Sequence, residues 1–194
     1  WGYVEFLEAI SNPKHEEHDD MLEWVRPSNG KDDIFIVTSQ GQAIRFRESA
    51  VRDMGRTASG VRGIKLKSND QVIGMDVVSP ELVKQKVLEL LVVSEHGLGK
   101  RTEISEYKVQ GRGGSGIKTM NVTDKTGRII NARVINNSED QDLLIISVKG
   151  QVVRIPLKSV PTLGRATQGV RIMRFKEVED KVVNITLLAT EEEV

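Results

Sequence analysis

Residues 34–41 read IFIVTSQG, and the same pattern returns as LLVVSEHG at residues 90–97 and as LLIISVKG at residues 143–150. Each copy opens with a run of branched apolar residues, which predicts a short strand buried on both faces. Each copy closes on a glycine, and these glycines lie 56 and then 53 residues apart. A glycine at this place suits a turn with positive φ. The period predicts an array of like supersecondary units.

Three more strands are expected around each copy of this stretch. A returning strand follows the turn glycine, then a loop, a third strand, a polar turn such as residues 68–70, and a fourth strand. The returning strands are expected at residues 42–46, 98–102 and 151–155, the third strand of the first copy at 61–66, and the fourth strands at 72–78, 129–135 and 182–188. Four short antiparallel strands in about 50 residues predict an all-β, propeller-like fold of four-stranded blades. Residues 79–91 could instead form a helix with Pro80 at its first position, but we favour a loop followed by a strand.

The repeat divides the chain into three whole blades within one domain, at residues 32–78, 88–135 and 142–188. Each copy has too little core to stand alone, so neighbours are expected to stack. In residues 1–31 only residues 20–25 resemble a fourth strand, which predicts a partial preceding blade with an acidic loop. Residues 189–194 form an acidic tail.

The bulk composition excludes several classes of protein. No stretch approaches 18 apolar residues, so no transmembrane helix is expected. The chain opens on Trp1 without a Met or a signal peptide, and we expect a fragment. It has no Cys, which excludes disulfides and suits a reducing cytosol. Residues 34–175 carry 23 Lys and Arg against 13 Asp and Glu, whereas both ends are acidic. This asymmetry favours a polyanionic partner, although a mixed solvated surface is the alternative.

Two local patterns imitate other sites. Residues 111–116 satisfy the dinucleotide-binding fingerprint and come within one residue of a Walker A loop, but both loops require a following helix. Residues 117–122 alternate like a strand, so nucleotide binding is not favoured. His15 and His18 lie in an acidic stretch without zinc-site spacing, and His96 stands alone beside a turn glycine. No nucleophile motif or triad is found, and the sequence gives no case for catalysis within this chain.

A second repeated motif, Gly-Arg-x-x-x-Gly, occurs at residues 55–60, 111–116 and 164–169, and we call each a Gly-Arg loop. The repeat places cations at equivalent positions, which form a stripe suited to a nucleic-acid backbone. Four residues after each turn glycine come Arg45, Arg101 and Arg154; the loop arginines are Arg56, Arg112 and Arg165; six residues further on come Arg62, Lys118 and Arg171. Further cations join without strict repetition: Arg47, Arg52, Lys65, Lys67, Lys100, Lys108, Lys149, Lys158 and Arg174.

The nature of the polyanion follows from the aromatic content, which is only 4%. Single-strand binders stack bases on exposed aromatic rings, whereas duplex DNA can be held by its phosphates alone. The residues therefore favour double-stranded DNA. For the loop glycines we favour a structural role, and the loop Arg could cap carbonyls of the next blade. For the second cation we favour phosphate contact, because Arg is replaced by Lys at Lys118.

The sequence strongly resembles the C-terminal domain of DNA gyrase A subunits, from about residue 20 to residue 188. The resemblance is carried by residues 44–49 with 54–64, by residues 99–102 with Glu106 and Tyr107, and by residues 160–170. It implies a β-pinwheel, a propeller-like disc whose blades exchange strands. The implied activity is wrapping of duplex DNA around the basic rim with a positive crossing, which the rest of the enzyme converts into negative supercoils with ATP.

The signature box of the resembled family reads Gln, basic, Arg, Gly, Gly, basic, Gly. Gln110, Gly111, Arg112, Gly113, Gly114, Ser115 and Gly116 match five of these seven positions, with Gly111 and Ser115 where cations are usual. The surrounding residues look like the last blades of the family rather than its first. The acidic tail also resembles this family, and it could compete with DNA for the basic face.

The resemblance further implies the partners and the setting. We expect double-stranded DNA as a partner, together with the remainder of the gyrase A chain and the gyrase B chain in an A2B2 assembly. We expect no membrane, and a monomeric isolated domain in the bacterial cytoplasm at the nucleoid. No cofactor is expected in this chain; ATP and Mg²⁺ belong to the rest of the enzyme. The expected DNA-binding residues are Arg45, Arg56, Arg62, Lys65, Lys100, Arg101, Lys108, Arg112, Lys118, Arg154, Arg165 and Arg171.

Two alternatives to this interpretation remain open. One is the C-terminal domain of the topoisomerase IV A chain, which steers substrate choice. The other is a propeller-type protein-interaction scaffold, which would carry apolar patches on its rim.

Overall fold

The computed structural model describes residues 30–52, 59–177 and 179–189. The chain divides into two compact units, residues 1–31 and 32–194, and all described strands belong to the second. The expected strand at residues 20–25, both acidic-loop histidines and the chain end beyond residue 189 lie outside the described residues.

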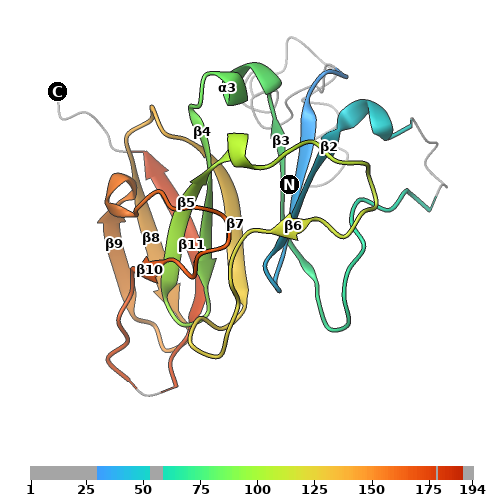
Figure 1. Ribbon diagram of the computed structural model, residues 1–194. Helices are drawn as coiled ribbons and strands as arrows, with labels where there is room; N and C mark the ends of the chain where they lie inside the picture. Colours follow the sequence, from blue (N-terminus) through green and yellow to red (C-terminus); the bar gives the residue numbers. More distant parts are fainter. Residues whose placement is uncertain (1–29, 53–58, 178, 190–194) are drawn as a thin grey trace, which may run out of the picture. The chain divides into compact units, whose positions relative to one another are not determined.

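Three antiparallel sheets are built from the three copies (Figure 1). Their main strands begin close to the predicted positions and follow the same order in each copy. They are β1 (Asp33–Thr38), β2 (Gln42–Arg47) and β3 (Val72–Val78); β4 (Leu88–Ser94), β5 (Leu98–Glu103) and β7 (Ile129–Asn136); and β8 (Gln141–Ser147), β9 (Val152–Pro156) and β11 (Val182–Ala189). The turn glycines Gly41, Gly97 and Gly150 have φ of 81°, 73° and 82°, as predicted.

The third strand of each copy corrects the sequence prediction. β6 (Ile117–Lys118) leaves the second copy and pairs with β2 of the first, and β10 (Val170–Arg171) of the third copy pairs with β5 of the second. The sheets therefore run β3-β1-β2-β6, β10-β5-β4-β7 and β11-β8-β9. Residues 61–66, expected as the third strand of the first copy, form no strand. In the other two copies the third strand pairs with the preceding copy. The strand exchange implied by the pinwheel resemblance is confirmed.

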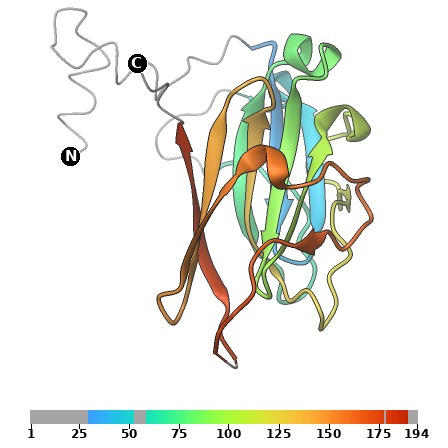
Figure 2. The same ribbon diagram turned by 90° about the vertical axis from the view of Figure 1, so that its left-hand side faces the viewer.

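The core lies between the sheets, which stack face to face with the third sheet nearest the viewer in Figure 2. β4 is buried along its whole length, as predicted. Leu90 and Val92 of this strand pack against the first copy, and Leu91 and Val93 pack against the third. β8 differs from the prediction, since alternate residues are only half-buried.

The two edges of each sheet have different surroundings. β7 lies against β3 and β11, so these fourth strands form an inner edge. A Cβ on Gly74 of β3 would come within 2.6 Å of the Ala132 carbonyl oxygen of β7. Asp76 of β3 accepts a hydrogen bond from the Val134 backbone N–H, and burial raises the pKa of this carboxyl. The exchanged strands β6 and β10 lie at the opposite, outer edge, on the right in Figure 2.

The prediction of a loop before the second copy is wrong at residues 80–84. They form a short helix, α3 (Pro80–Lys84), with proline in its first turn, where the missing N–H costs nothing. Short 3-10 turns follow each second strand, η1 (Glu48–Ala50), η2 (Ile104–Glu106) and η3 (Leu157–Ser159). Within the described residues, no helix is long and apolar enough to cross a membrane.

Candidate nucleic-acid interface

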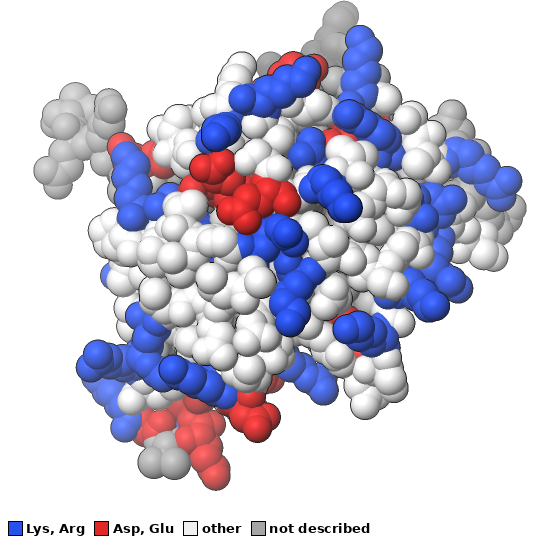
Figure 3. All heavy atoms as spheres, viewed as in Figure 1, with Lys and Arg blue, Asp and Glu red and all other residues white. Residues whose placement is uncertain are grey.

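The second cation of each copy lies at the outer edge. Lys118 is the last residue of β6 and Arg171 the last residue of β10, and both side chains are exposed. Arg62, the equivalent residue of the first copy, is also exposed. Figure 3 shows Lys and Arg side chains spread over the face that carries β6 and β10, with Asp and Glu side chains near its centre and toward its lower edge. This exposure leaves all three side chains open to the phosphate contact expected of them, which stays a prediction.

The arginines of the Gly-Arg loops connect successive second cations. Arg112 donates from Nη1 to the Arg62 carbonyl at 2.7 Å and from Nε to the Ala50 carbonyl at 3.0 Å. Arg165 donates from Nη1 to the Lys118 carbonyl at 3.2 Å. Arg112 and Arg165 thus cap carbonyls, as the structural alternative predicted, but those of the preceding copy and not of the next one. Both arginines also extend the row of positive charge. We call this row the cation band: Arg62, Arg112, Lys118, Arg165 and Arg171.

Backbone hydrogen bonds hold neighbouring loops of the band together. The Lys65 N–H donates to the Gly114 carbonyl at 2.8 Å, and the Asn121 N–H donates to the Thr167 carbonyl at 3.1 Å. These two bonds join equivalent positions in successive copies. The variant box is further fixed to the first copy by its Gln110 N–H, which donates to the Arg45 carbonyl. Arg56, which belongs to the first Gly-Arg loop, lies outside the described residues.

The closing glycines of the second and third Gly-Arg loops are required by the strand exchange. Gly116 has φ of 71° and Gly169 has φ of 78°. A Cβ on Gly116 would lie 2.6 Å from the Ala43 carbonyl oxygen, and a Cβ on Gly169 would lie 2.7 Å from that of Gly99. A Cβ on Gly111 or Gly164, the opening glycines of these two loops, would meet nothing within 4 Å, and neither glycine has a positive φ. The structural role favoured for the loop glycines therefore belongs to the closing one.

Two of the three arginines that lie four residues after a turn glycine, Arg45 and Arg101, are structural. Arg45 is buried and its Nε donates to Asp33 at 2.7 Å, while Nη1 reaches the Tyr107 carbonyl of the next copy. Arg101 is held in the same way by Glu89 and by the Val160 carbonyl. The third member of this set, Arg154, donates to Asp142 at 2.6 Å. The exposed fractions of the three side chains are 8%, 12% and 59%. Arg45 and Arg101 cannot face a phosphate as they stand, which corrects the expectation for both.

The two contacts between copies differ in what lies under the Gly-Arg loop. We call them the first junction (loop 111–116 on the first copy) and the second junction (loop 164–169 on the second copy). At the first junction the apolar residues Ile44 and Phe46 of β2 are buried beside Ile64. At the second junction the equivalent residues of β5 are Lys100 and Thr102, both buried. Lys100 was expected to contact DNA directly, and its burial corrects that expectation.

The polar groups of the second junction point at the loop. Lys100 Nζ donates to the carbonyls of Gly164 at 2.7 Å and Arg165 at 2.6 Å, and Thr102 Oγ1 donates to the Leu163 carbonyl. Burial lowers the pKa of Lys100 to about 8; the Glu106 carboxylate opposes this shift and Arg165 adds to it.

A buried tyrosine supports the same loop. Tyr107 lies under Arg165, whose guanidinium carbon is 5.8 Å from the ring centroid. Burial raises the pKa of Tyr107 to about 12, so this ring stays neutral.

The remaining predicted cations are divided between exposed and ion-paired positions. Lys65, Lys67, Lys108, Arg52 and Arg174 are exposed. Three others form ion pairs: Arg47 with Asp33, Lys149 with Glu177 and Lys158 with Asp140. Lys65 and Lys108 therefore remain candidates for DNA contact beside the cation band.

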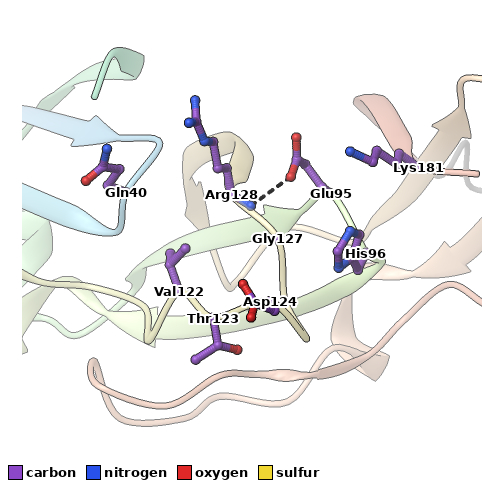
Figure 4. A pocket seen from close by; sticks show the side chains of 9 residues that line it. All are labelled: Gln40, Glu95, His96, Val122, Thr123, Asp124, Gly127, Arg128 and Lys181. Carbon is purple, nitrogen blue, oxygen red and sulfur yellow. Dashed lines mark hydrogen bonds between the residues drawn. The ribbon is translucent and has the colours of Figure 1, made fainter. Parts of the chain in front are cut away.

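A hollow of about 580 Å³ lies at the turn ends of the sheets, away from the band (Figure 4). It is lined by Gln40, Glu95, His96, Val122, Thr123, Asp124, Gly127, Arg128 and Lys181. Glu95 accepts a hydrogen bond from the Arg128 N–H at 3.0 Å, and His96 Nδ1 lies 3.3 Å from the Lys125 carbonyl oxygen. These contacts hold the turns. No group of three acidic or histidine side chains in the described ranges could hold a metal ion.

The nucleotide-loop pattern at residues 111–116 is not followed by a helix. β6 begins at Ile117, and residues 119–128 form turns and extended chain. The argument from the sequence against a phosphate loop at a helix N-terminus is confirmed.

One neighbour of the cation band was not predicted as a site residue. This is Glu106, whose carboxylate accepts a hydrogen bond from the Arg165 N–H at 3.2 Å. The sequence could have indicated Glu106, because only the second copy has a carboxylate at this position; the equivalent residues of the first and third copies are Ala50 and Ser159.

Antiparallel blades, of which the second and third each donate a strand to the preceding sheet, define a β-pinwheel fold. The chain matches the family described as DNA gyrase C-terminal domain, beta-propeller, over residues 32–79, 88–136 and 141–189, and it belongs to that family.

Individual relatives agree with this assignment. The chain is 42% identical over 159 residues to the DNA gyrase A subunit of Staphylococcus epidermidis, and 42% identical over 157 residues to that of Staphylococcus aureus. These matches cover 82% and 81% of this chain but only 17% of each relative.

Solved structures show the same fold. A DNA gyrase A C-terminal domain superposes with a TM-score of 0.69 at 26% identity, over 81% of this chain and 51% of that one. The C-terminal domain of a DNA topoisomerase IV superposes with a TM-score of 0.73 at 21% identity, over 84% of this chain and 48% of that one. At this identity the likeness to topoisomerase IV concerns the fold alone. The chain thus spans about half of these domains and a small part of a whole gyrase A chain.

Proposed function

We propose that the chain binds double-stranded DNA along the cation band and bends the duplex around its outer edge, as part of the DNA-wrapping domain of a gyrase. The observation that carries the proposal is the exposed cation at the end of β6, repeated at the end of β10. A regular row of cations suits regularly spaced phosphates and reads no base sequence. Phe35, Phe46 and Tyr107 are buried and offer bases nothing to stack on, which supports duplex over single strand.

The relatives suggest the setting in which this binding serves. The matched Staphylococcus proteins are DNA gyrase A subunits, of which this chain spans 17%. We therefore propose that the rest of the gyrase A chain, with a gyrase B chain in an A2B2 assembly in the bacterial cytoplasm, uses the wrapped DNA for ATP-dependent negative supercoiling. ATP and Mg²⁺ would bind to those other parts.

A mobility-shift series with linear duplex at rising salt tests the DNA binding. About five phosphate contacts predict a slope of log affinity against log salt of roughly −4 to −5. Replacing Arg62, Lys118 and Arg171 together by Glu should lower affinity at least about 100-fold. The matched control replaces Lys84, Lys125 and Lys181 by Glu, which are exposed, lie outside the band and give the same change in net charge. Equal losses in both variants would reject the band as the binding site.

Topology of bound circles tests the wrapping. Relaxed plasmid incubated with the chain and a nicking-closing enzyme should gain positive writhe if the duplex wraps around the outer edge. Binding without any change in writhe would favour the topoisomerase IV alternative, in which the domain steers substrate choice. A protein-interaction scaffold would show no salt-dependent binding to duplex at all.

A further inference from the structure

The second junction contains a carboxylate in contact with the cation band. The Glu106 side chain accepts a hydrogen bond from the Arg165 backbone N–H at 3.2 Å, and its oxygen lies 3.9 Å from Arg165 Nε. Both side chains are partly exposed, with 42% of Glu106 and 33% of Arg165 accessible. An anion therefore already sits at one position of the row that is proposed to receive phosphates.

The loop beneath this anion is oriented by a cation that the other copies lack. Lys100 draws the carbonyls of Gly164 and Arg165 inward, and the equivalent residues of the other copies are Ile44 and Val153. In a trans peptide the N–H points away from the carbonyl, so inward carbonyls turn the N–H groups of this stretch toward the outside. Outward N–H groups beside an Arg form an anion-binding concavity.

Glu106 offsets part of the positive charge around the loop. Lys100 and Arg165 are the cations that act on this carboxylate, and Arg165 also donates a hydrogen bond to the Lys118 carbonyl. With a pKa of about 8, Lys100 carries its charge at neutral pH. The first junction has neither the buried cation nor the carboxylate, because Ile44 and Ala50 stand there.

We propose that Lys100, Arg165 and the loop N–H groups form a phosphate site at the second junction, which Glu106 occupies in the free chain and leaves when DNA binds. Lys100 acts as a positioning residue, while Arg165 and the loop contact the phosphate. A carboxylate and a phosphate oxygen accept the same charge-assisted hydrogen bonds, so the exchange keeps the donors satisfied. This inference rests on the proposed DNA binding and adds a defined site with a competing internal anion.

Anisotropy titrations of a labelled linear duplex test the exchange. Glu106→Gln removes the competitor, and we expect affinity to rise about three- to fivefold and the salt slope to steepen by about one phosphate. The matched control is Glu103→Gln, which removes the same charge three residues away, where Glu103 contacts Ser105 and Lys86 instead of the band. An equal gain from Glu103→Gln would show a general charge effect and overturn the proposal.

A second pair of variants tests the role of Lys100. In a Lys100→Met background the gain from Glu106→Gln should disappear, and in a Lys100→Arg background it should persist, because the charge and the donors remain. Thermal melts establish that each variant is folded. If Lys100→Met does not fold, the comparison of Glu106→Gln with Glu103→Gln, together with the Lys100→Arg background, still tests the phosphate site. If the unaltered chain shows no salt-dependent binding, the proposed function fails. If it binds but Glu106→Gln changes nothing, only the phosphate site fails.

Discussion

The first and second junctions share one backbone arrangement over different side chains. In both, a loop arginine caps the preceding copy, a closing glycine of positive φ approaches a carbonyl, and a two-residue strand completes the preceding sheet. Under the loop, however, the first junction is apolar at Ile44 and the second is polar at Lys100.

The loops differ accordingly. The loop over Ile44 contains Gly113 and Gly114, whereas the loop over Lys100 has Ala166 and Thr167. The glycine-rich backbone of the first loop can pack closely against an apolar surface. The second loop, which has side chains at these positions, is held by hydrogen-bond donors to its carbonyl groups. The contacts that both junctions share therefore join the copies to one another. The side chains that differ under the two loops determine how each loop binds an anion.

The largest expected effect concerns the shared part, the buried acid–arginine pair of each junction. Asp33→Ala and Glu89→Ala each leave a buried guanidinium without its carboxylate, at Arg45 and Arg101. We expect each to lower the free energy of unfolding by about 3–5 kcal/mol. Urea titration measures this loss. Asp142→Ala is the control, because Arg154 is exposed, and it should cost less than about 1 kcal/mol. Equal losses at all three positions would contradict the burial argument.

The closing glycines should also matter equally at both junctions. Gly116→Ala and Gly169→Ala add a Cβ at positive φ within 2.7 Å of a carbonyl oxygen. Strain and overlap together should cost about 2–4 kcal/mol. Gly111→Ala and Gly164→Ala, which meet nothing within 4 Å, serve as controls and should be nearly neutral. Thermal melts compare the four variants, and a neutral Gly116→Ala would refute the close approach of the exchanged strand.

The third prediction separates the junctions. Lys100→Met removes the donor of the Gly164 and Arg165 carbonyls, and leaving such groups without partners costs about 1–3 kcal/mol. Ile44→Met keeps the volume and the apolar character of the first junction and should cost less than about 1.5 kcal/mol. Hydrogen exchange should show faster exchange at residues 164–169 in Lys100→Met only. Equal behaviour of both loops would remove the distinction between the junctions.

The sequence predicted the repeat and the order of the main strands, because burial and turn chemistry leave a local pattern. It did not predict which strands β6 and β10 join, since the partner of a two-residue strand is chosen by packing between copies. Nor did it separate Arg45 from Arg62, as a repeated Arg looks alike whether it pairs or faces solvent. The distinguishing signal was present: Asp33, Glu89 and Asp142 each precede an Arg of that set by 12 residues.

The smallest expected effect is a pH dependence confined to the second junction. The folded pKa of Lys100, about 8, lies below the value of about 10.4 for a free lysine, so the unfolded chain binds more protons between these values. The free energy of unfolding should therefore rise with pH from about 8 to 10.4, and fall as pH drops through 8.

One titrating proton limits this slope to about 1.4 kcal/mol per pH unit. The Glu106 carboxylate favours the charged amine and so works against the lowering of the Lys100 pKa by burial. Urea midpoints measured across this pH range report the dependence. We expect the rise with pH to be absent in Lys100→Met and to remain in Ile44→Met. The dependence should also be smaller in the complex with duplex DNA, because a phosphate at the loop favours the charged amine as Glu106 does. A slope unchanged in Lys100→Met would assign the titration to another group and leave the two junctions electrostatically alike.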